Sequence, residues 1–209
     1  AEYIDYDPVA ERFCMSEEQV FVLANDESPM SVGGALQFTT PSMYNVPKIV
    51  TAFKEGGGVC YNEIGDEIPL GIERFFRPGY VHFLAKEWIG ALDGMTARLD
   101  VGARVADIGC GRGQSTLALA RGFPRSKVVG VDNHAESIAH ARGLATEEGL
   151  ENVAFIECSA DEMPETERFD LICSFDCIHD MVNPIGTLST IRELLVEDGI
   201  YFWSEPNGS

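Results

Sequence analysis

The residues whose types and spacing suggest chemistry lie between Asp107 and Gly113, in the pattern Asp-x-Gly-x-Gly-x-Gly. They follow an apolar run at 104–108 and precede a predicted helix at 115–121. Glycines at such a turn let the backbone bend sharply and approach a bound molecule closely. Open α/β sheets bind their ligands at the carboxyl ends of the strands. The pattern therefore predicts a ligand site at this turn.

The glycine spacing and the charge of Asp107 narrow the class of ligand. A dinucleotide-binding turn of the type G-x-G-x-x-G would need a third glycine at position 114, where the chain has Gln114. A phosphate-binding loop of the type G-x4-G-K-[ST] would need a lysine that is absent here. A carboxylate ahead of the glycines repels a pyrophosphate and attracts a cation. We therefore expect a zwitterionic ligand that carries a sulfonium group.

Strand-like and helix-like segments alternate from Ala103 onward, as is typical of a parallel sheet with helices on both faces. The predicted strands are 104–108, 127–132, 152–156, 169–174 and 199–203, and the predicted helices are 115–121, 136–148 and 184–196. The fold class predicted for this part is α/β, with a Rossmann-like, doubly wound parallel sheet.

The N-terminal part predicts a smaller, mainly helical region that carries a β-hairpin. The expected elements are a hairpin over 3–15, a helix after the Ser16–Gln19 capping box, and several short helices over 28–55 that are broken at Gly33-Gly34 and end at Gly56. Within them, Pro47 suits a first helical turn with Asn45 as its cap, and Pro78 suits the start of a long helix. We expect a domain boundary between 77 and 78. The chain begins without Met and ends soon after the fifth strand, so we expect it to be trimmed at both ends.

Composition excludes several classes of function. The 209 residues carry a formal net charge of −19, and no stretch supplies the basic surface that nucleic acid requires. No apolar run is long enough to span a membrane. None of the six cysteines form the C-x2-C pairs of a zinc site, so we predict no metal ligands and a reducing, cytoplasmic location.

Residues 103–206 resemble class I S-adenosylmethionine-dependent methyltransferases, and Asp107 to Gly113 is similar to the first motif of that family. The resemblance implies S-adenosylmethionine as the cofactor, with this turn against its methionine part. Asp132 ends the second strand, as the ribose-binding acid of the family does, and a carboxylate can accept hydrogen bonds from both ribose hydroxyls. His134 follows closely and is a candidate to contact the ribose or adenine.

The loop 158–164 is similar to the adenine loop of the family, D-A-x-x-L-P. Ser159 stands where the family usually has Asp, and Ala160 matches the small residue whose backbone amide meets the adenine ring. The acceptor for the adenine amino group is then either Asp161 or Ser159. An alternative role for Asp161 is to cap the next helix.

The segment 175–181 follows the fourth strand, where the family places residues between the methyl donor and the methyl acceptor. The resemblance assigns Phe175 to the cofactor site. The His179-Asp180 pair resembles a motif of O-methyltransferases with a winged-helix domain, in which the histidine is a general base. Histidine titrates near neutral pH and can take a proton from a hydroxyl group. Asp180 or Asp176 would orient it; the alternative is a purely structural histidine.

The hairpin over 3–15 resembles the wing of a winged-helix domain, which in such relatives serves dimerisation and encloses the substrate. We therefore expect a homodimeric S-adenosylmethionine-dependent methyltransferase that acts on a small-molecule acceptor, with O-methylation as the favoured reaction. Two alternatives remain open. One is a cofactor-binding regulator without turnover, and the other is an NAD-dependent dehydrogenase.

Overall fold

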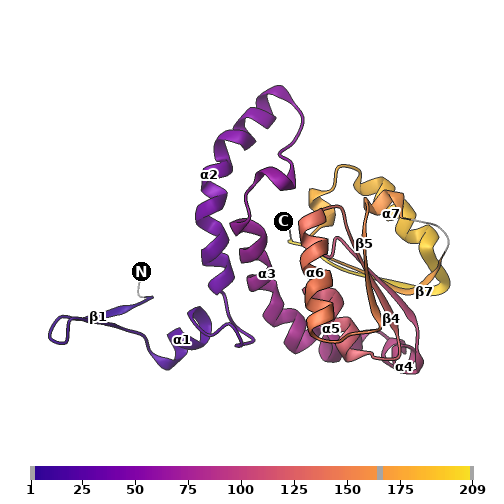
Figure 1. The fold of residues 1–209 in the computed structure, drawn as a ribbon, viewed down its shortest axis with the longest axis horizontal. Coiled ribbons are helices and arrows are strands. Elements are labelled where there is room, and N and C mark those ends of the chain that lie inside the picture. The colour runs from indigo at the N-terminus through magenta and orange to yellow at the C-terminus, as the bar shows by residue number, and fades with distance from the viewer. Residues whose placement is uncertain (1–2, 164–166, 208–209) are drawn as a thin grey trace. The chain divides into compact units, whose positions relative to one another are not determined.

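The computed structural model describes residues 3–163 and 167–207, and the chain forms two compact units, Ala1–His82 and Phe83–Ser209 (Figure 1). No helix among these residues is both long enough and apolar enough to cross a membrane.

The second unit is built on a five-stranded parallel sheet in the order β5-β4-β3-β6-β7. The strands are β3 (Arg104–Ile108), β4 (Lys127–Asp132), β5 (Val153–Glu157), β6 (Phe169–Phe175) and β7 (Leu195–Ser204). The prediction of a parallel α/β sheet is confirmed. The chain adds β4 and β5 on one side of β3 and then returns to add β6 on the other side. The strand order therefore reverses beside β3, and such a reversal opens a crevice at the carboxyl ends of the strands.

Helices cover both faces of this sheet (Figure 1). They are α4 (Met95–Val101), α5 (Gln114–Gly122), α6 (Ala135–Glu147) and α7 (Pro184–Leu194). One buried cluster joins Phe155 of β5 to Leu117 of α5 and Ile138 of α6. A second cluster packs Ile191 and Leu194 of α7 against β3, β4 and β6. Strand β5 contributes to both clusters, with Phe155 in the first and Ile156 against the second, because neighbouring residues of a strand point to opposite faces.

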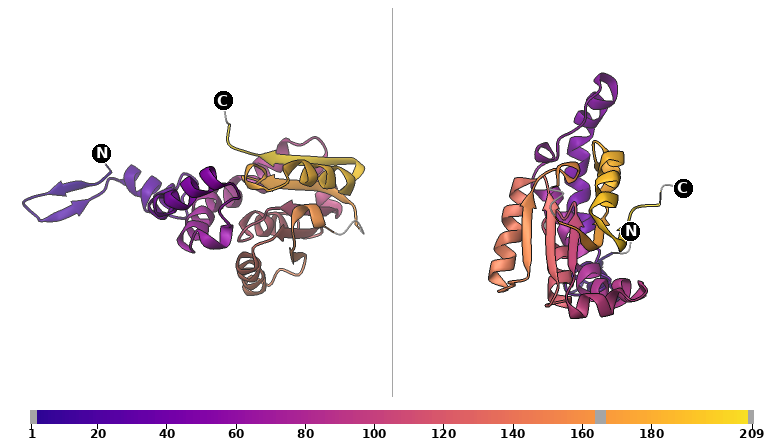
Figure 2. Two further views of the ribbon diagram at one scale, coloured as in Figure 1. Left: turned by 90° about the horizontal axis from the view of Figure 1, so that it is seen from above. Right: turned by 90° about the vertical axis from the view of Figure 1, so that its right-hand side faces the viewer.

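The first unit begins with a hairpin of β1 (Asp5–Asp7) and β2 (Arg12–Cys14), which is a two-stranded antiparallel ribbon (Figure 2). Helix α1 (Glu17–Leu23) follows, and its start is the predicted capping box: the Gln19 amide donates to Ser16 Oγ, and the Ser16 amide donates to Gln19 Oε1. The hairpin and the capping box were thus predicted correctly.

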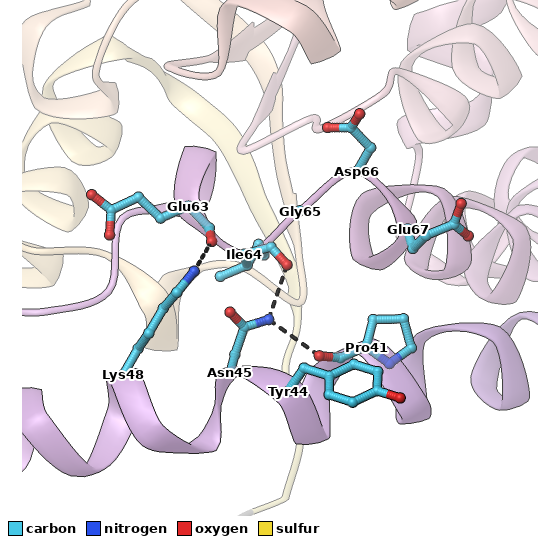
Figure 3. Close-up of a pocket in the computed structure, with 9 residues that line it drawn as sticks. All are labelled: Pro41, Tyr44, Asn45, Lys48, Glu63, Ile64, Gly65, Asp66 and Glu67. Atoms are coloured by element: carbon cyan, nitrogen blue, oxygen red, sulfur yellow. Dashed lines mark hydrogen bonds between the residues drawn. The ribbon is translucent and has the colours of Figure 1, made fainter.

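The prediction of several short helices over 28–55 was wrong, because one helix of 23 residues, α2 (Gly33–Glu55), contains both Pro41 and Pro47. Asn45 does not cap a new helix. It is buried inside α2, where its side chain donates to the carbonyl oxygens of Pro41 and Ile64 (Figure 3). Proline lacks an amide donor, so a helix with two prolines needs support from outside its own ladder. Packing of α2 against the following helix supplies that support.

That following helix is α3 (Glu67–Gly79), preceded by one 3₁₀ turn at Tyr61–Glu63. Pro78 lies inside α3 and does not start a helix, so this prediction was also wrong. A π-helical stretch, Tyr80–Trp88, and a 3₁₀ turn, Ile89–Ala91, continue the chain. Helices α2 and α3 meet without intervening side chains at Gly34, where an added Cβ would lie 2.3 Å from the Phe75 nitrogen. This close approach explains why the Gly33-Gly34 pair is part of a helix interface and not a break.

Candidate functional site

The glycine turn at the end of β3 is the centre of the candidate site. Gly109, Gly111 and Gly113 have φ angles of 68°, 51° and 86°, which favour glycine. A Cβ on Gly109 would lie 2.6 Å from Cys177 Sγ, whereas a Cβ on Gly111 would meet nothing within 4 Å. The first glycine is therefore required by packing inside the protein, and Gly111 faces open space that a ligand could enter.

Gly113 is the N-cap of α5, and its replacement should test how tightly the turn is packed. A Cβ there would lie 2.6 Å from the Ala141 Cβ and 3.0 Å from the Phe155 ring. We expect Gly113→Ala to lower the free energy of unfolding by roughly 2–4 kcal/mol, through backbone strain and overpacking. Urea denaturation measures this change. The matched control is Gly143→Ala in α6, where a Cβ meets nothing within 4 Å, so equal losses in both variants would contradict the packing argument.

Asp107, two residues before the first glycine, is almost fully buried. Its Oδ2 accepts hydrogen bonds from the hydroxyls of Ser115 and Thr116, both at 2.6 Å. Its Oδ1 is buried and accepts no hydrogen bond from any described residue. Burial raises the pKa of this carboxyl to about 6, although the two hydroxyls lower it. A buried carboxylate oxygen without a donor is costly in isolation and fits a cationic ligand group.

Asp132 holds the glycine turn in place from the end of β4. Its Oδ2 accepts the Gly111 amide at 2.8 Å and its Oδ1 accepts the His134 amide at 2.9 Å. Each carboxylate oxygen keeps a further lone pair, so the residue can still accept hydrogen bonds from a ligand. The structure therefore brings the predicted ribose-binding acid next to the open Gly111.

His134 is buried and caps helix α6. Its Nδ1 accepts the Ser137 amide at 3.2 Å and lies 2.8 Å from Ser137 Oγ. The sequence offered this histidine as a contact to ribose or adenine. In the structure Nδ1 is occupied by the cap, and Nε2 lies 3.9 Å from Glu136 Oε2.

The predicted adenine loop follows β5 and includes a 3₁₀ turn, Ala160–Glu162. Ser159 Oγ donates to Asp161 Oδ1 at 2.5 Å, and Asn183 Nδ2 donates to Asp161 Oδ2 at 3.3 Å. Asn183 is also the cap of α7. Asp161 thus connects its own loop to the start of α7, and Ser159 is tied to it. Pro164, on which the loop resembles the family, lies outside the described residues.

Phe175, at the end of β6, is buried. Its ring packs edge-on against Phe202 at a centroid distance of 5.7 Å and lies 6.2 Å from the Trp88 ring. These contacts make Phe175 part of the core next to the glycine turn. A cofactor contact through Phe175 would therefore involve a ring already fixed by its neighbours.

His179 lies on a 3₁₀ turn, Ile178–Asp180, and is paired with Glu205, a residue that sequence reasoning missed. His179 Nδ1 is 2.5 Å from Glu205 Oε2. Glu205 Oε1 accepts the amides of Cys177 at 3.1 Å and Ile178 at 2.8 Å. The hydrogen bond to Glu205 raises the pKa of His179. Burial raises the pKa of Glu205, but its hydrogen bonds from His179 and the two amides leave it below its ordinary value.

The two aspartates predicted to orient His179 are Asp180 and Asp176, and neither forms a hydrogen bond with a ring nitrogen of His179. Asp180 Oδ1 is 3.6 Å from His179 Nε2 and is largely exposed. Asp176 has a φ of 54°, and burial raises the pKa of its carboxyl. Glu205 therefore stands where an orienting carboxylate is needed. The signal that could have found it is an acid directly after the fifth predicted strand, at the same edge of the sheet as His179.

A separate pocket of about 320 Å³ lies in the first unit, between α2 and the segment 63–67 (Figure 3). Its lining residues are Pro41, Tyr44, Asn45, Lys48, Glu63, Ile64, Gly65, Asp66 and Glu67. None of the residues predicted for the site lines it. The chemistry suggested by the sequence therefore lies at the sheet edge of the second unit and not in this pocket.

Comparison with known proteins identifies the class of protein that this fold and site define. Residues 99–208, more than half of the chain, match the family model described as "Methyltransferase domain". The chain belongs to this methyltransferase family.

Individual relatives give the extent of the similarity. A ubiquinone biosynthesis O-methyltransferase of Actinobacillus pleuropneumoniae is 29% identical over 112 residues, covering 51% of this chain and 47% of that protein. The PKMT2 protein of Rickettsia typhi, solved in complex with AdoHcy, is 27% identical with a TM-score of 0.50, covering 58% of this chain and 24% of that one. The mitomycin 7-O-methyltransferase MmcR is 16% identical with a TM-score of 0.69, covering 95% of this chain and 60% of that one. At this identity the similarity supports a shared fold and nothing about function. The chain spans about half the length of the curated relatives it matches.

Proposed function

We propose that this chain binds S-adenosylmethionine and transfers its methyl group to a small-molecule acceptor. The observation that carries the proposal is the buried Asp107 carboxylate, whose Oδ1 has no donor among the described residues, beside a glycine turn that is open at Gly111. Together they fit a ligand with a cationic amino group next to a close backbone approach. Membership of the methyltransferase family supports the same conclusion.

The cofactor roles follow the strand order of the sheet. Asp107, with the turn Gly109, Gly111 and Gly113, would hold the methionine part, and Asp132 would accept the ribose hydroxyls. Ser159, Ala160 and Asp161 would face the adenine, with His134 and Phe175 alongside. When bound, the cofactor supplies an electrophilic methyl group on sulfonium, so the protein mainly has to align the acceptor and exclude water.

We infer O-methylation as the reaction, with His179 as the general base. Glu205 binds Nδ1, so the imidazole would carry its proton there and leave Nε2 free to accept one. The acceptor hydroxyl would give its proton to His179 Nε2 while its oxygen forms the bond to the methyl carbon and the bond from sulfur to that carbon breaks. Glu205 is then a positioning residue. O-methyltransferases among the relatives are consistent with this reaction.

We further infer that the chain works as a homodimer through its N-terminal, winged-helix-like unit. Helix α2 exposes Leu36, Met43, Val50 and Phe53 at intervals that place them along one face. An exposed apolar face of this kind is typical of a protein interface. Light scattering coupled to size exclusion would test the dimer; a monomer at working concentrations would contradict it. A cytoplasmic location stays a prediction.

The test of the cofactor is calorimetric titration with S-adenosylhomocysteine, S-adenosylmethionine and NAD. We expect micromolar binding of the two sulfur ligands and none of NAD. Asp132→Ala should abolish binding, because it removes both the proposed ribose acceptor and the hydrogen bond that fixes Gly111. A matched control is Asp170→Ala on β6, whose Oδ2 accepts the Arg104 amide at the start of β3, away from the site. Binding of NAD alone would overturn the proposal.

A further inference from the structure

Asp176, His179 and Glu205 form a cluster that the proposed reaction uses only in part. Each offers one ligand atom, and the three atoms lie within 4.8 Å of one another. Asp176 follows β6 directly, and Glu205 follows β7, which pairs with β6. The cluster is therefore set by the sheet, at the carboxyl ends of two neighbouring strands.

The Glu205 side chain is fixed by its neighbours, and the Asp176 carboxylate keeps its oxygens available for a ligand. The Glu205 side chain is only 12% exposed, and two backbone amides fix its Oε1 while Oε2 points to His179. Such outer hydrogen bonds orient the carboxylates of metal sites in the same way. Asp176 is half-buried, and none of the described residues donates a hydrogen bond to its carboxylate.

The charge of the surroundings favours a cation. Two carboxylates, those of Asp176 and Glu205, lie beside a single imidazole, and no Lys or Arg of the described residues forms an ion pair with either. The attraction of a divalent ion to such a group is strong, since partly buried charges are screened less than exposed ones.

We propose that Asp176, His179 and Glu205 bind one divalent transition-metal ion of the zinc class, which would prevent His179 from acting as a base. One imidazole nitrogen and two carboxylate oxygens form a donor set that suits zinc and its neighbours, whereas magnesium and calcium prefer oxygen alone. Three protein ligands leave a position open to water. Cysteine spacing, on which the prediction of no metal ligands was based, gives no signal for a site of one histidine and two carboxylates.

The consequence for catalysis rests on the proposed function. A metal bound at His179 Nδ1 would take the place of the hydrogen bond to Glu205 and leave the proton of the neutral imidazole on Nε2. The ring could then no longer accept a proton from the acceptor hydroxyl. The metal-loaded chain would therefore bind the cofactor normally but would be inhibited in methyl transfer to oxygen.

The test is titration of the chelator-treated chain with Co²⁺, followed by visible absorption, and with Zn²⁺, followed by calorimetry. We expect one ion per chain, with the absorption of a site of nitrogen and oxygen ligands. Asp176→Asn and Glu205→Gln should each weaken binding by about tenfold or more, as is typical for loss of one ligand or its support. Asp180→Asn removes a neighbouring carboxylate from outside the cluster and should leave the affinity close to that of the wild type.

Thermal unfolding of each variant establishes that it is folded before the comparison is made. Absence of Co²⁺ binding, equal affinity in Asp176→Asn and wild type, or the intense ultraviolet band of thiolate ligands would each overturn the inference. Metal binding is measured without any methyl acceptor, so its failure is separate from failure of the proposed activity. Methyl transfer without zinc binding would contradict only the metal site, and zinc binding without methyl transfer would contradict only the reaction.

Discussion

Replacing His179 with alanine is expected to lower kcat for a hydroxyl acceptor by roughly 10²–10⁴-fold, the usual contribution of a positioned general base. The affinity for S-adenosylhomocysteine should stay unchanged, because none of the described contacts of the glycine turn or of Asp132 involves His179. The measurement is formation of S-adenosylhomocysteine in a screen of small molecules that carry a hydroxyl group, together with calorimetry of the same variant.

Replacement of Glu205 should lower kcat less than replacement of His179, because Glu205 positions the base and does not itself take the proton. Glu205→Gln keeps the size of the side chain but removes the charge that favours protonated His179, so we expect kcat to fall by roughly tenfold or more. The ¹⁵N chemical shifts of the imidazole should change with it, because the carboxylate that fixes the Nδ1–H form is gone. Asp180→Asn is the control and should retain near wild-type kcat.

Full activity in His179→Ala would show that the histidine is not the base of the reaction.

Cofactor affinity is expected to decline at acidic pH because of Asp107. Its pKa is about 6 in the cofactor-free protein, mainly through burial, and a cationic amino group requires the ionised carboxylate. Protonation must be reversed on binding, so the Kd for S-adenosylhomocysteine should rise by about tenfold between about pH 7 and about pH 5. Calorimetric titration across this range measures the change.

The variant Asp107→Asn isolates this effect. It should bind the cofactor more weakly at neutral pH and lose the pH dependence above about pH 5 that Asp107 causes. Asp132 and the thiols of Cys110, Cys173 and Cys177 are the other titratable groups near Asp107. The thiols stay neutral, since burial raises their pKa values, so they do not contribute in this range. An unchanged pH profile in the variant would show that another group is responsible.

Asp107 should also make the cofactor-free fold less stable at neutral pH. A carboxyl whose folded pKa is raised costs nothing below its ordinary value of 3.8, and its cost is complete above about pH 6. Asp107→Asn should therefore increase the free energy of unfolding at neutral pH by about 2–3 kcal/mol, while it weakens cofactor binding. Loss of stability in this variant would indicate that the charge is compensated by the protein itself.

Much of the second unit could be predicted from the sequence because local pattern and tertiary role agree there. Strand β4 was predicted with its bounds, since Lys127–Asp132 is an apolar run between turns, and its ends are fixed by pairing with β3 and β5. The glycine turn was predictable because its positive φ angles favour glycine.

Helix α2 could not be predicted from local pattern. Prolines normally end helices, but contacts with residues distant in sequence stabilise this helix across Pro41 and Pro47. Asn45 reaches the carbonyl of Ile64, and Gly34 allows the backbone of α3 to approach. Glu205 was missed for a related reason. It lies 26 residues after His179, and only the pairing of β6 with β7 brings the two together.

The strand order of the sheet divides the two halves of the site between different parts of the chain. Apart from Phe175, the residues proposed for the cofactor lie at the ends of β3, β4 and β5 or just after them, whereas His179 and Glu205 follow β6 and β7, on the other side of the reversal. Mutations that reshape the second group can therefore accumulate while the first is preserved. Such a division would let the proposed acceptor side of the site change independently of the proposed donor side.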